Sequence, residues 1–456
     1  MDAPRAEGKR KAAQERRRNG EGRIVMRRRF ARLPLWSGAP LLSLAACATG
    51  TGTVPGSPAE APDATTPVAS AVDVHRRTTG FLDAGLWISN EIRGGWLDEV
   101  WREGDSLVVV RIRPENTPIN NSQWYAFKLW SHEPDTLELR LTYDGGRHRY
   151  WPRIRTGALG AWQPLPQEAV RVDSSATAAT LRLEVGPDTV WVAGQELFTS
   201  ETFRAWNDSL AGLPHVTLST IGTSPGGRSL DMLQITADPE ALRHVFLLGR
   251  QHPPEVTGTL ALLRFVEKLA GDSPLAREFR RHYQVHVVPL VNPDGVDLGY
   301  WRHNTNGVDL NRDWVAFQQP ETRIVRSALL GVLERPGAEV WFAADFHSTN
   351  RDVFFTLDRS LETRPAGFVD RWLDRIRLDL PDYSVSDVPS GLDSPTSRNW
   401  FYREFGAPAV IYEVGDATDR ALIREVATTA ARALMELLLE ELRAMGVETT
   451  ADEALR

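Results

Sequence analysis

The sequence predicts a globular protein in which an antiparallel β-sandwich domain precedes an α/β domain with a mixed, mostly parallel sheet flanked by helices. Three observations indicate this order. Apolar and polar residues alternate with a period of two between residues 76 and 205, which is typical of strands with one buried face. From residue 206 to 446 buried strands alternate with helical segments, which is typical of α/β sheets. A hydrophobic fraction of 42% over 456 residues is enough to fill cores in both parts.

The expected β-sandwich domain occupies residues 76–205. The segments SLVVVRIRPE and WYAFKLW have strand length and strand composition. Two hairpins are expected, one in LELRLTYDGGRHRYW around Asp144–Gly146 and one in LRLEVGPDTVWVAG around Gly186–Asp188. Many tryptophans fall in this region, and we expect most of them to be core residues, with a carbohydrate-binding platform as the alternative. Their positions are 87, 96, 101, 124, 130, 151, 162 and 191.

The expected α/β domain occupies residues 206–446. It opens with the strand pair HVTLSTIG and SLDMLQIT around the turn SPGG. Further strands are expected at VFLLG, YQVHVVPLV, EVWFAADFH and APAVIYEVG, and helices at VTGTLALLRFVEKLA and FVDRWLDRIRLDL. A long final helix is expected to stop at Gly446, and residues 447–456 form a tail. In such sheets, sites gather where strands end and loops begin.

The first 75 residues predict export and anchoring. Residues 1–47 contain a basic cluster at Arg27–Arg29, a short apolar stretch and small residues, which is the order of a signal peptide; translation would then start at Met26. The ending LAAC resembles the lipobox of bacterial lipoproteins, so we expect Cys47 to be lipidated and to hold the chain at a membrane. A chance cysteine in an ordinary signal peptide is the alternative. Residues 48–75 predict a flexible linker, and the expected location is the cell envelope, on the periplasmic side.

Charge and cysteine content exclude some classes of protein. The formal net charge of -7 disfavours nucleic-acid binding, because no basic excess is available to displace phosphate counterions. Cys47 is the single cysteine, which excludes an intramolecular disulfide and a cysteine-based zinc cluster. The oligomeric state is not predicted.

A candidate metal site begins directly after the buried strand VFLLG, in RQHPPEVTG. His252 lies past the strand end and Glu255 at the start of the next helix, and the two prolines between them stiffen the connection. His347, at the end of the strand EVWFAADFH, is the third candidate. Two close ligands and one distant ligand, all N or O donors, predict one catalytic Zn²⁺ per chain with a position open for water. For the first pair, a loop histidine beside a helix-entry glutamate is the plainer alternative.

Glu413 interrupts the apolar strand APAVIYEV. A buried carboxylate there is destabilising, so it is expected only where it has a charged partner or a catalytic role. Beside a zinc-activated water it can accept a proton and pass it to a leaving amine; a solvent-facing position is the alternative. The loop over residues 302–312 offers guanidinium and amide groups that suit a carboxylate, from Arg302, Asn304, Asn311 and Arg312. These groups together predict hydrolysis beside a free carboxylate.

Six short motifs, HPPE, NPDG, WRHN, GVDLNRDW, DFHS and YEVG, resemble those of zinc metallocarboxypeptidases of the carboxypeptidase A type. They occur in family order over residues 215–445. The β-rich region before them, with LTYDGGRHRYW and VWVAG, resembles the cytosolic carboxypeptidase branch. The resemblance implies a peptidase that removes C-terminal residues, here carried by a bacterial lipoprotein.

The resemblance also implies a role for each candidate residue. Glu413 would act as general base and acid toward the zinc-activated water, and Arg302 would stabilise the oxyanion of the tetrahedral intermediate. The zinc ligands would be His252, Glu255 and His347, and the C-terminal carboxylate of the peptide substrate would be held by Asn311 and Arg312.

Two departures qualify the resemblance, and one further position bears on specificity. Gly391 occupies the position of the tyrosine that precedes the catalytic glutamate in pancreatic-type enzymes, and the substitute would come from Tyr383, Tyr402 or Tyr412. Arg398 occupies the position of the side-chain pocket, where a basic residue favours C-terminal Glu or Asp. An export signal does not belong on a cytosolic enzyme, so tubulin-type substrates are not implied.

Two other functions stay open from the sequence. One is an exported zinc amidohydrolase acting on cell-wall peptides or acylated amino acids. The other is a non-catalytic binding lipoprotein in which the β-sandwich domain recognises the ligand.

Overall fold

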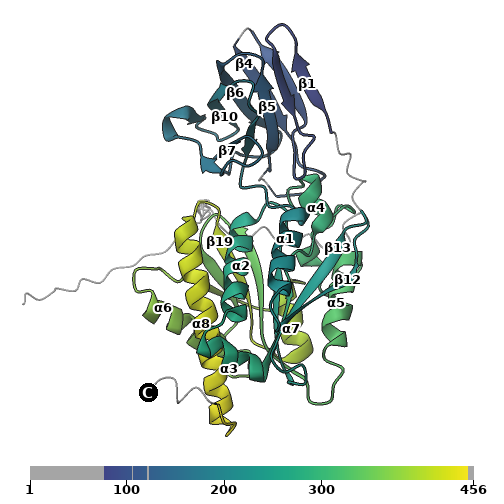
Figure 1. Cartoon of the computed structure of the whole chain (residues 1–456), viewed down its shortest axis with the longest axis vertical. Coiled ribbons are helices and arrows are strands. Elements are labelled where there is room, and N and C mark those ends of the chain that lie inside the picture. The colour runs from purple at the N-terminus through teal and green to yellow at the C-terminus, as the bar shows by residue number, and fades with distance from the viewer. Residues whose placement is uncertain (1–75, 105, 121–122, 450–456) are drawn as a thin grey trace, which may run out of the picture. The chain divides into compact units, whose positions relative to one another are not determined.

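The N-terminal part of the structure is a pair of β-sheets packed face to face (Figure 1). The computed structural model describes residues 76–449 except 105 and 121–122, so the expected signal region, Cys47 and linker lie outside the described residues. One sheet has the order β1 (Thr78–Phe81), β2 (Leu86–Ser89), β5 (Ala126–Ser131), β11 (Val190–Ala193), β7 (Arg153–Thr156) and β8 (Gln163–Pro164). The other has the order β3 (Glu99–Glu103), β4 (Leu107–Ile112), β6 (Asp135–Tyr143), β10 (Ala178–Val185) and β9 (Val170–Val172).

The two predicted hairpins do not form. Strand β6 pairs with β10 along its whole length, RHRYW is not a strand, and β11 belongs to the other sheet, between β5 and β7. The physical reason is the shared core. Strand β10 buries every second residue toward the other sheet, to which β11 belongs, so the chain crosses between sheets at Gly186–Thr189 instead of folding back. A short 3-10 helix, η1 (Gln167–Ala169), precedes β9.

The prediction that the tryptophans are mostly core residues is wrong. Trp96 and Trp124 are buried, but the other six are at least partly exposed. Along β2, β5 and β11, indoles alternate with buried neighbours and therefore point away from the core. Several pair with outward-facing cations, as where the Arg155 guanidinium lies 4.3 Å from the Trp191 ring centre.

The C-terminal part is built on one eight-stranded mixed sheet. Its order is β12 (Val216–Thr223), β13 (Ser229–Ile235), β15 (Tyr283–Val288), β14 (Arg243–Gly249), β16 (Glu339–Thr349), β19 (Ala409–Gly415), β17 (Val353–Leu357) and β18 (Asp387–Ser390). The four central strands, β15, β14, β16 and β19, run parallel, and antiparallel pairs flank them. The central strands are almost entirely buried, as expected for a sheet covered on both faces.

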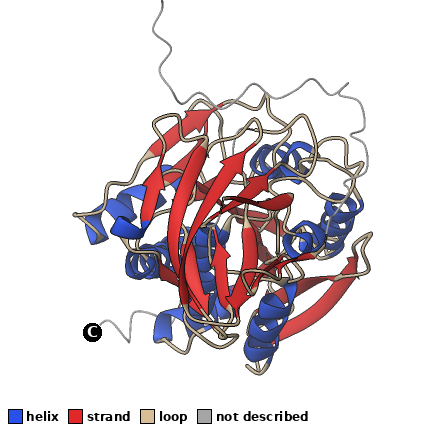
Figure 2. Cartoon of the chain, turned by 90° about the horizontal axis from the view of Figure 1, so that it is seen from above, coloured by secondary structure: helices blue, strands red, loops and turns tan. Residues whose placement is uncertain are grey.

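Helices cover both faces of this sheet (Figure 2). One face packs against α1 (Ser200–Ala211), α2 (Val256–Ala270), α3 (Pro274–His282), α6 (Phe368–Asp379) and α8 (Arg420–Ala444). The other packs against α5 (Pro320–Gly331) and α7 (Ser397–Phe405). Two short helices, α4 (Pro293–Leu298) and η2 (Leu310–Arg312), lie in the connection between β15 and α5. Among the residues described, none of the helices has the length and apolar character needed to cross a membrane.

The site depends on which strand ends are neighbours. Because β14, β16 and β19 are parallel and adjacent, their carboxyl ends lie at the same edge of the sheet. The register pairs Gly249 of β14 with Phe346 of β16, and His347 of β16 with Glu413 of β19. The last residues of β14 and the polar residues of β16 and β19 are therefore presented side by side.

Helix α2 packs against β16 at Gly258 with no room for a side chain. A Cβ there would lie 2.2 Å from the carbonyl oxygen and 2.6 Å from the carbonyl carbon of His347. Ser348 fixes the same turn, since its Oγ accepts hydrogen bonds from the Gly258 amide and the Thr257 hydroxyl, each at 2.8 Å. These backbone contacts set the spacing between the helix that follows Glu255 and the strand that carries His347.

We expect Gly258→Ala to destabilise the protein even though alanine is the better helix former. Overpacking against backbone atoms costs about 1–3 kcal/mol, which exceeds the gain of about 0.5–1 kcal/mol from replacing a helical glycine. The free energy of unfolding, measured by denaturant titration, checks this. The control is Gly331→Ala at the end of α5, where a Cβ would meet nothing within 4 Å. Equal stability of the two variants would contradict the packing argument.

Candidate active site

The structure brings His252, Glu255 and His347 into one buried cluster. Their candidate ligand atoms all lie within 4.8 Å of one another. The Glu255 carboxylate lies between the imidazoles, with Oε1 2.8 Å from His252 Nδ1 and Oε2 2.7 Å from His347 Nδ1. The two Nδ1 atoms are 3.2 Å apart. The sequence placed these residues at a strand end, a helix start and a second strand end, and the fold makes those three points coincide.

Local interactions shape the connection that carries the first two of these residues. Glu255 is the N-cap residue of α2, and the chain enters it through Pro253 and Pro254. Arg250 adopts a left-handed backbone conformation at φ 55° and turns its buried guanidinium back on this connection. It donates to the Pro253 carbonyl at 2.7 Å and to the Thr259 hydroxyl at 3.0 Å, which ties the end of β14 to the first turn of α2.

A second layer of carboxylates holds the two imidazoles. His252 Nε2 lies 2.9 Å from Asp309 Oδ1, and His347 Nε2 lies 2.9 Å from Asp345 Oδ2. Each contact suits a protonated Nε2, which leaves Nδ1 free to act as a ligand. Asp345 is held in turn by hydrogen bonds from the Gln251 side chain and the Ser397 hydroxyl.

The charges of the cluster are strongly coupled. Burial raises the pKa of Glu255, but His252 and His347 outweigh burial and hold that pKa well below its usual value. Burial lowers the pKa of His347, but Asp345 and Glu255 raise it well above the usual value. The carboxylates therefore favour a positive charge at this point, which protons or a metal cation can supply.

Glu413 lies beside this cluster with an unsatisfied oxygen. Its Oε2 is buried and has no hydrogen-bond partner among the described residues. Burial, and next the charge of Glu255, raise the pKa of Glu413 to about 7. A carboxylate with a raised pKa and a free oxygen beside a cation site is suited to exchange protons near neutral pH.

The arginine and asparagine candidates differ in where they lie. Arg302 Nε and Nη2 each lie 2.7 Å from Asp309 Oδ2, so one carboxylate joins Arg302 to His252. Asn311 Nδ2 is 3.3 Å from His347 Nε2, while its Oδ1 accepts from the Ser397 amide. Arg312 donates to the carbonyl of its neighbour Asn311 at 3.0 Å. Arg302 and Asn311 thus contact the cluster directly, and Arg312 extends from its rim.

Arg398 is buried in α7, next to Ser397, without a carboxylate partner among the described residues. Its guanidinium donates to the carbonyls of Thr356 and Gly391 and to the side chains of Ser390 and Asn399. Burial lowers the pKa of Arg398 to about 10. The protein therefore satisfies the hydrogen bonds of this cation but leaves its charge uncompensated.

The tyrosine candidates are not joined to the cluster by any hydrogen bond within the described part of the chain. The Tyr383 hydroxyl donates to Asp352 at 3.0 Å, and Tyr412 is buried in the main apolar core. Tyr402 lies on α7. The structure therefore selects none of the three for the role at Gly391.

Sequence reasoning missed Asp309, Asp345 and Arg149. Asp345 left a signal, because it interrupts the same apolar strand as His347 two residues earlier. Asp309 was visible only as part of a motif. Arg149 left no signal, since it comes from the β-sandwich: it pairs with Asp416 at 2.6 Å, just beyond β19, and its guanidinium lies 5.2 Å from the Trp301 ring centre.

A mixed α/β sheet with two imidazoles and a carboxylate at the carboxyl ends of its parallel strands defines a metallohydrolase-like protein. The comparison with protein families is more specific, because residues 204–356 match the family of zinc carboxypeptidases. The chain is therefore similar to zinc carboxypeptidases over that segment.

Individual proteins are similar to parts of the chain. Mouse cytosolic carboxypeptidase 6 is 31% identical over 162 residues, which cover 33% of this chain and 30% of that protein. An uncharacterised protein of Zymomonas mobilis is 26% identical over 272 residues, covering 58% of this chain and 67% of that protein. The match to the mouse relative therefore spans less than a third of that relative's length.

A solved structure shares the fold of most of the chain. The metallo-carboxypeptidase from Burkholderia cenocepacia superposes with a TM-score of 0.64 at 20% identity, covering 79% of this chain and 99% of that one. Because the superposition includes more than the α/β domain, the likeness extends to the β-sandwich that precedes it. At this identity it shows a common fold.

We expect Asp345→Asn and Asp309→Asn each to weaken zinc binding. Loss of the carboxylate partner of a ligating imidazole typically lowers metal affinity about 10–100-fold. Competition with a chromogenic chelator measures the affinity. Asp352→Asn serves as the control, because Asp352 accepts hydrogen bonds from the Gly415 amide and the Thr418 hydroxyl but contacts neither imidazole. Unchanged affinity in both test variants would show that the outer carboxylates do not tune the ligands.

Proposed function

We propose that the protein is a zinc-dependent carboxypeptidase that releases C-terminal residues from peptides, with a preference for Glu or Asp. The observation that carries this proposal is the buried His252–Glu255–His347 cluster with the free Glu413 Oε2 beside it. The match of residues 204–356 to the family of zinc carboxypeptidases supports it. The retained ligand set and Glu413 argue against a purely binding lipoprotein.

The donor set fits zinc. Two imidazoles and one carboxylate form a common catalytic zinc set, and both imidazoles have their outer nitrogens held by carboxylates. Among the described residues, no lysine or arginine forms an ion pair with Glu255. This buried carboxylate is therefore suited to bind a cation. When bound, zinc would supply Lewis acidity toward a water molecule and toward the scissile carbonyl.

Glu413 is suited to move the proton that hydrolysis requires. The water oxygen bonds to the carbonyl carbon while the C–N bond breaks, and one water proton has to reach the leaving nitrogen. Glu413 Oε2 can accept that proton and release it to the amine, because its raised pKa makes both transfers accessible near neutral pH.

Arg302 is suited to stabilise the negative charge that develops on the carbonyl oxygen. Burial lowers its pKa, but the charges of Asp309, Glu255 and Glu413 raise it above the usual value, so the guanidinium stays cationic near these carboxylates. A fixed cation of this kind acts mainly in the transition state. Asn311, beside the cluster, and Arg312, at its rim, would hold the C-terminal carboxylate of the substrate.

Arg398 supports the acidic preference. It is a buried cation whose charge no protein carboxylate compensates among the described residues. A C-terminal Glu or Asp side chain would supply that charge by replacing one of the neutral acceptors around the guanidinium. The preference therefore rests on charge balance as well as on position.

The cellular setting remains a proposal on sequence grounds. The basic and apolar segment that ends at Cys47 supports export and lipid anchoring in the cell envelope. In that setting, cell-wall peptides and acylated amino acids are the alternative substrates of the same site.

We expect Glu413→Gln to abolish most peptide hydrolysis while leaving zinc binding at one equivalent. Loss of a general base typically lowers the rate about 10²–10⁴-fold. The assay follows amino acids released from zinc-loaded protein given peptides that differ only in a C-terminal Glu, Lys or Leu. Glu321→Gln is the matched control, since Glu321 is also a buried glutamate with an unpartnered oxygen, Oε1. If wild-type protein binds zinc but releases nothing from these peptides, the amidohydrolase alternative replaces the proposal.

We expect Arg398→Met to remove the preference for acidic residues. Hydrogen bonds to a charged group contribute about 1.5–3 kcal/mol, so release of Glu relative to Leu falls by a factor of roughly 10–100. The ratio of kcat/KM for the two peptides measures this. Arg403→Met, on the same helix but exposed, is the control and keeps the wild-type ratio. An unchanged ratio in Arg398→Met would exclude Arg398 from the pocket.

A further inference from the structure

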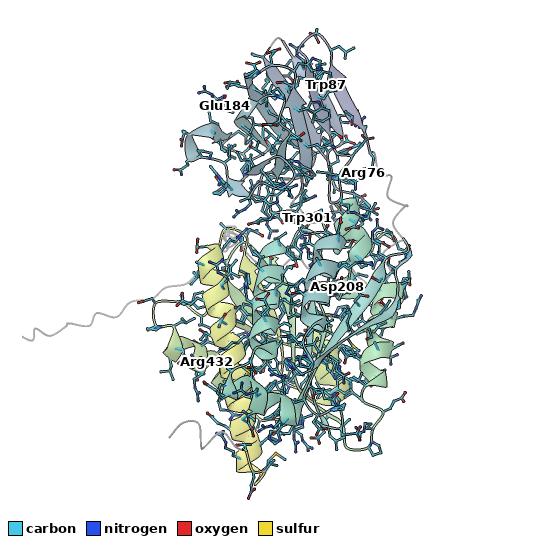
Figure 3. All side chains as sticks on the ribbon, in the orientation of Figure 1. Arg76, Trp87, Glu184, Asp208, Trp301 and Arg432 are labelled. Carbon is cyan, nitrogen blue, oxygen red and sulfur yellow. The ribbon has the colours of Figure 1, made fainter. Side chains whose placement is uncertain are left out.

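The segment that carries Arg302 is embedded in the β-sandwich. Tyr300 and Trp301 follow α4 of the α/β domain, yet both belong to the apolar core of the sandwich, together with residues such as Trp96 and Tyr150. Figure 3 shows Trp301 at the junction of the two parts of the molecule. Its indole Nε1 also donates to the side chain of Asn120. The residue directly before Arg302 is thus anchored in the β-sandwich and not in the α/β domain to which this segment belongs.

Glu115 of the sandwich binds the backbone of this segment. Its Oε2 accepts from the Trp301 amide at 3.0 Å, and its Oε1 accepts from the Arg302 and His303 amides, both at 2.8 Å. The residue is buried and forms no ion pair with any described cation. Three successive amides therefore solvate one buried carboxylate, an arrangement that fixes the direction of all three N–H groups.

Asn116 holds the far side of the same segment. Its Oδ1 lies 2.6 Å from His303 Nδ1, and its Nδ2 donates to the Gly307 carbonyl at 3.2 Å. The backbone on both sides of Arg302 is consequently held by residues from the loop after β4. Arg302 itself turns the other way, toward Asp309 and the zinc-ligand cluster.

We propose that Glu115 is a positioning residue that sets the place of Arg302 in the active site, so that the β-sandwich acts as part of the catalytic apparatus. The proposal rests on the proposed function in one respect, namely that Arg302 acts on the substrate. A carboxylate that binds three successive amides controls both the position and the tilt of the peptide units around Arg302. Displacements of about 1 Å in a catalytic group can cost about 100-fold in rate.

The test compares Glu115→Gln, Glu115→Asp and Asp98→Asn in the full chain. Gln keeps the size of the side chain but replaces one acceptor oxygen with an NH₂ group that opposes an amide N–H, whereas Asp keeps the charge and shortens the reach. Asp98 is the matched control, because it is a buried carboxylate of the sandwich that pairs with Arg111 and Arg113 and contacts no residue of the segment.

Hydrogen–deuterium exchange of the amides at 301–303 shows, without any substrate, whether Glu115 holds these amides. We expect faster exchange at these amides in Glu115→Gln, a smaller effect in Glu115→Asp and none in Asp98→Asn. For peptide hydrolysis we expect kcat to fall about 10–100-fold in Glu115→Gln with KM and zinc content nearly unchanged, because the lost interaction acts in the transition state. If Glu115→Gln does not fold, Glu115→Asp provides the same comparison.

A double-mutant cycle with Arg302→Ala separates positioning from general stability. If Glu115 acts through Arg302, adding Glu115→Gln to Arg302→Ala lowers kcat little further. An equal loss in both backgrounds, or unchanged exchange at 301–303, would overturn the proposal. If the wild-type protein hydrolyses no peptide, the proposed function fails on its own, and exchange confined to 301–303 still decides whether Glu115 holds the segment.

Discussion

The placement of one carboxylate between two imidazoles is the interaction on which the rest of the site depends. Glu255 can occupy that place only because β14 and β16 are adjacent and parallel, and because α2 starts directly from the end of β14. The close approach at Gly258 then fixes the height of Glu255 relative to His347. The sheet order and the absence of a side chain at Gly258 thus determine the relative positions of the candidate ligands.

Opposite charges alternate outward from this centre. The Glu255 carboxylate faces imidazoles, the imidazoles face Asp309 and Asp345, and Asp309 faces the guanidinium of Arg302. Such alternation makes a buried set of ionisable groups tolerable, because each charge is solvated by its neighbours in place of water. Glu413 Oε2 and the charge of Arg398 have no partner in this series, and we therefore propose Glu413 for proton transfer and Arg398 for substrate recognition.

Much of the fold and the centre of the site could be predicted from sequence because their signals are local. His252, Glu255, His347 and Glu413 are polar residues within or directly after apolar runs, and the motif order tied them together. Asp345 gave the same local signal and was passed over. The hairpin predictions were wrong because turn chemistry at Gly186–Asp188 does not reveal which sheet the next strand will join. The prediction of core tryptophans was wrong because a period of two places a residue on one face of a strand without showing which face is buried.

Contacts between distant parts of the chain had no local signal at all. Glu115 lies 187 positions from Arg302 in sequence, and its polar neighbourhood, RPENTP, marks it only as a loop residue after a strand. Arg149 belongs to a segment that was assigned to a hairpin, so its pairing with Asp416 could not be anticipated. Sequence spacing likewise does not show which tyrosine would take the role of the residue at the Gly391 position, because this depends on how loops fold over the site.

The burial of Trp301 in the β-sandwich has a consequence for how the protein unfolds. The boundary between the two cores does not coincide with any boundary along the chain, since a tryptophan from one domain completes the interior of the other. Opening the sandwich would expose that indole and strip three amides of their acceptor, at a free-energy cost borne by both domains. The two domains are therefore thermodynamically linked: loss of the sandwich and loss of the catalytic geometry belong to a single cooperative transition.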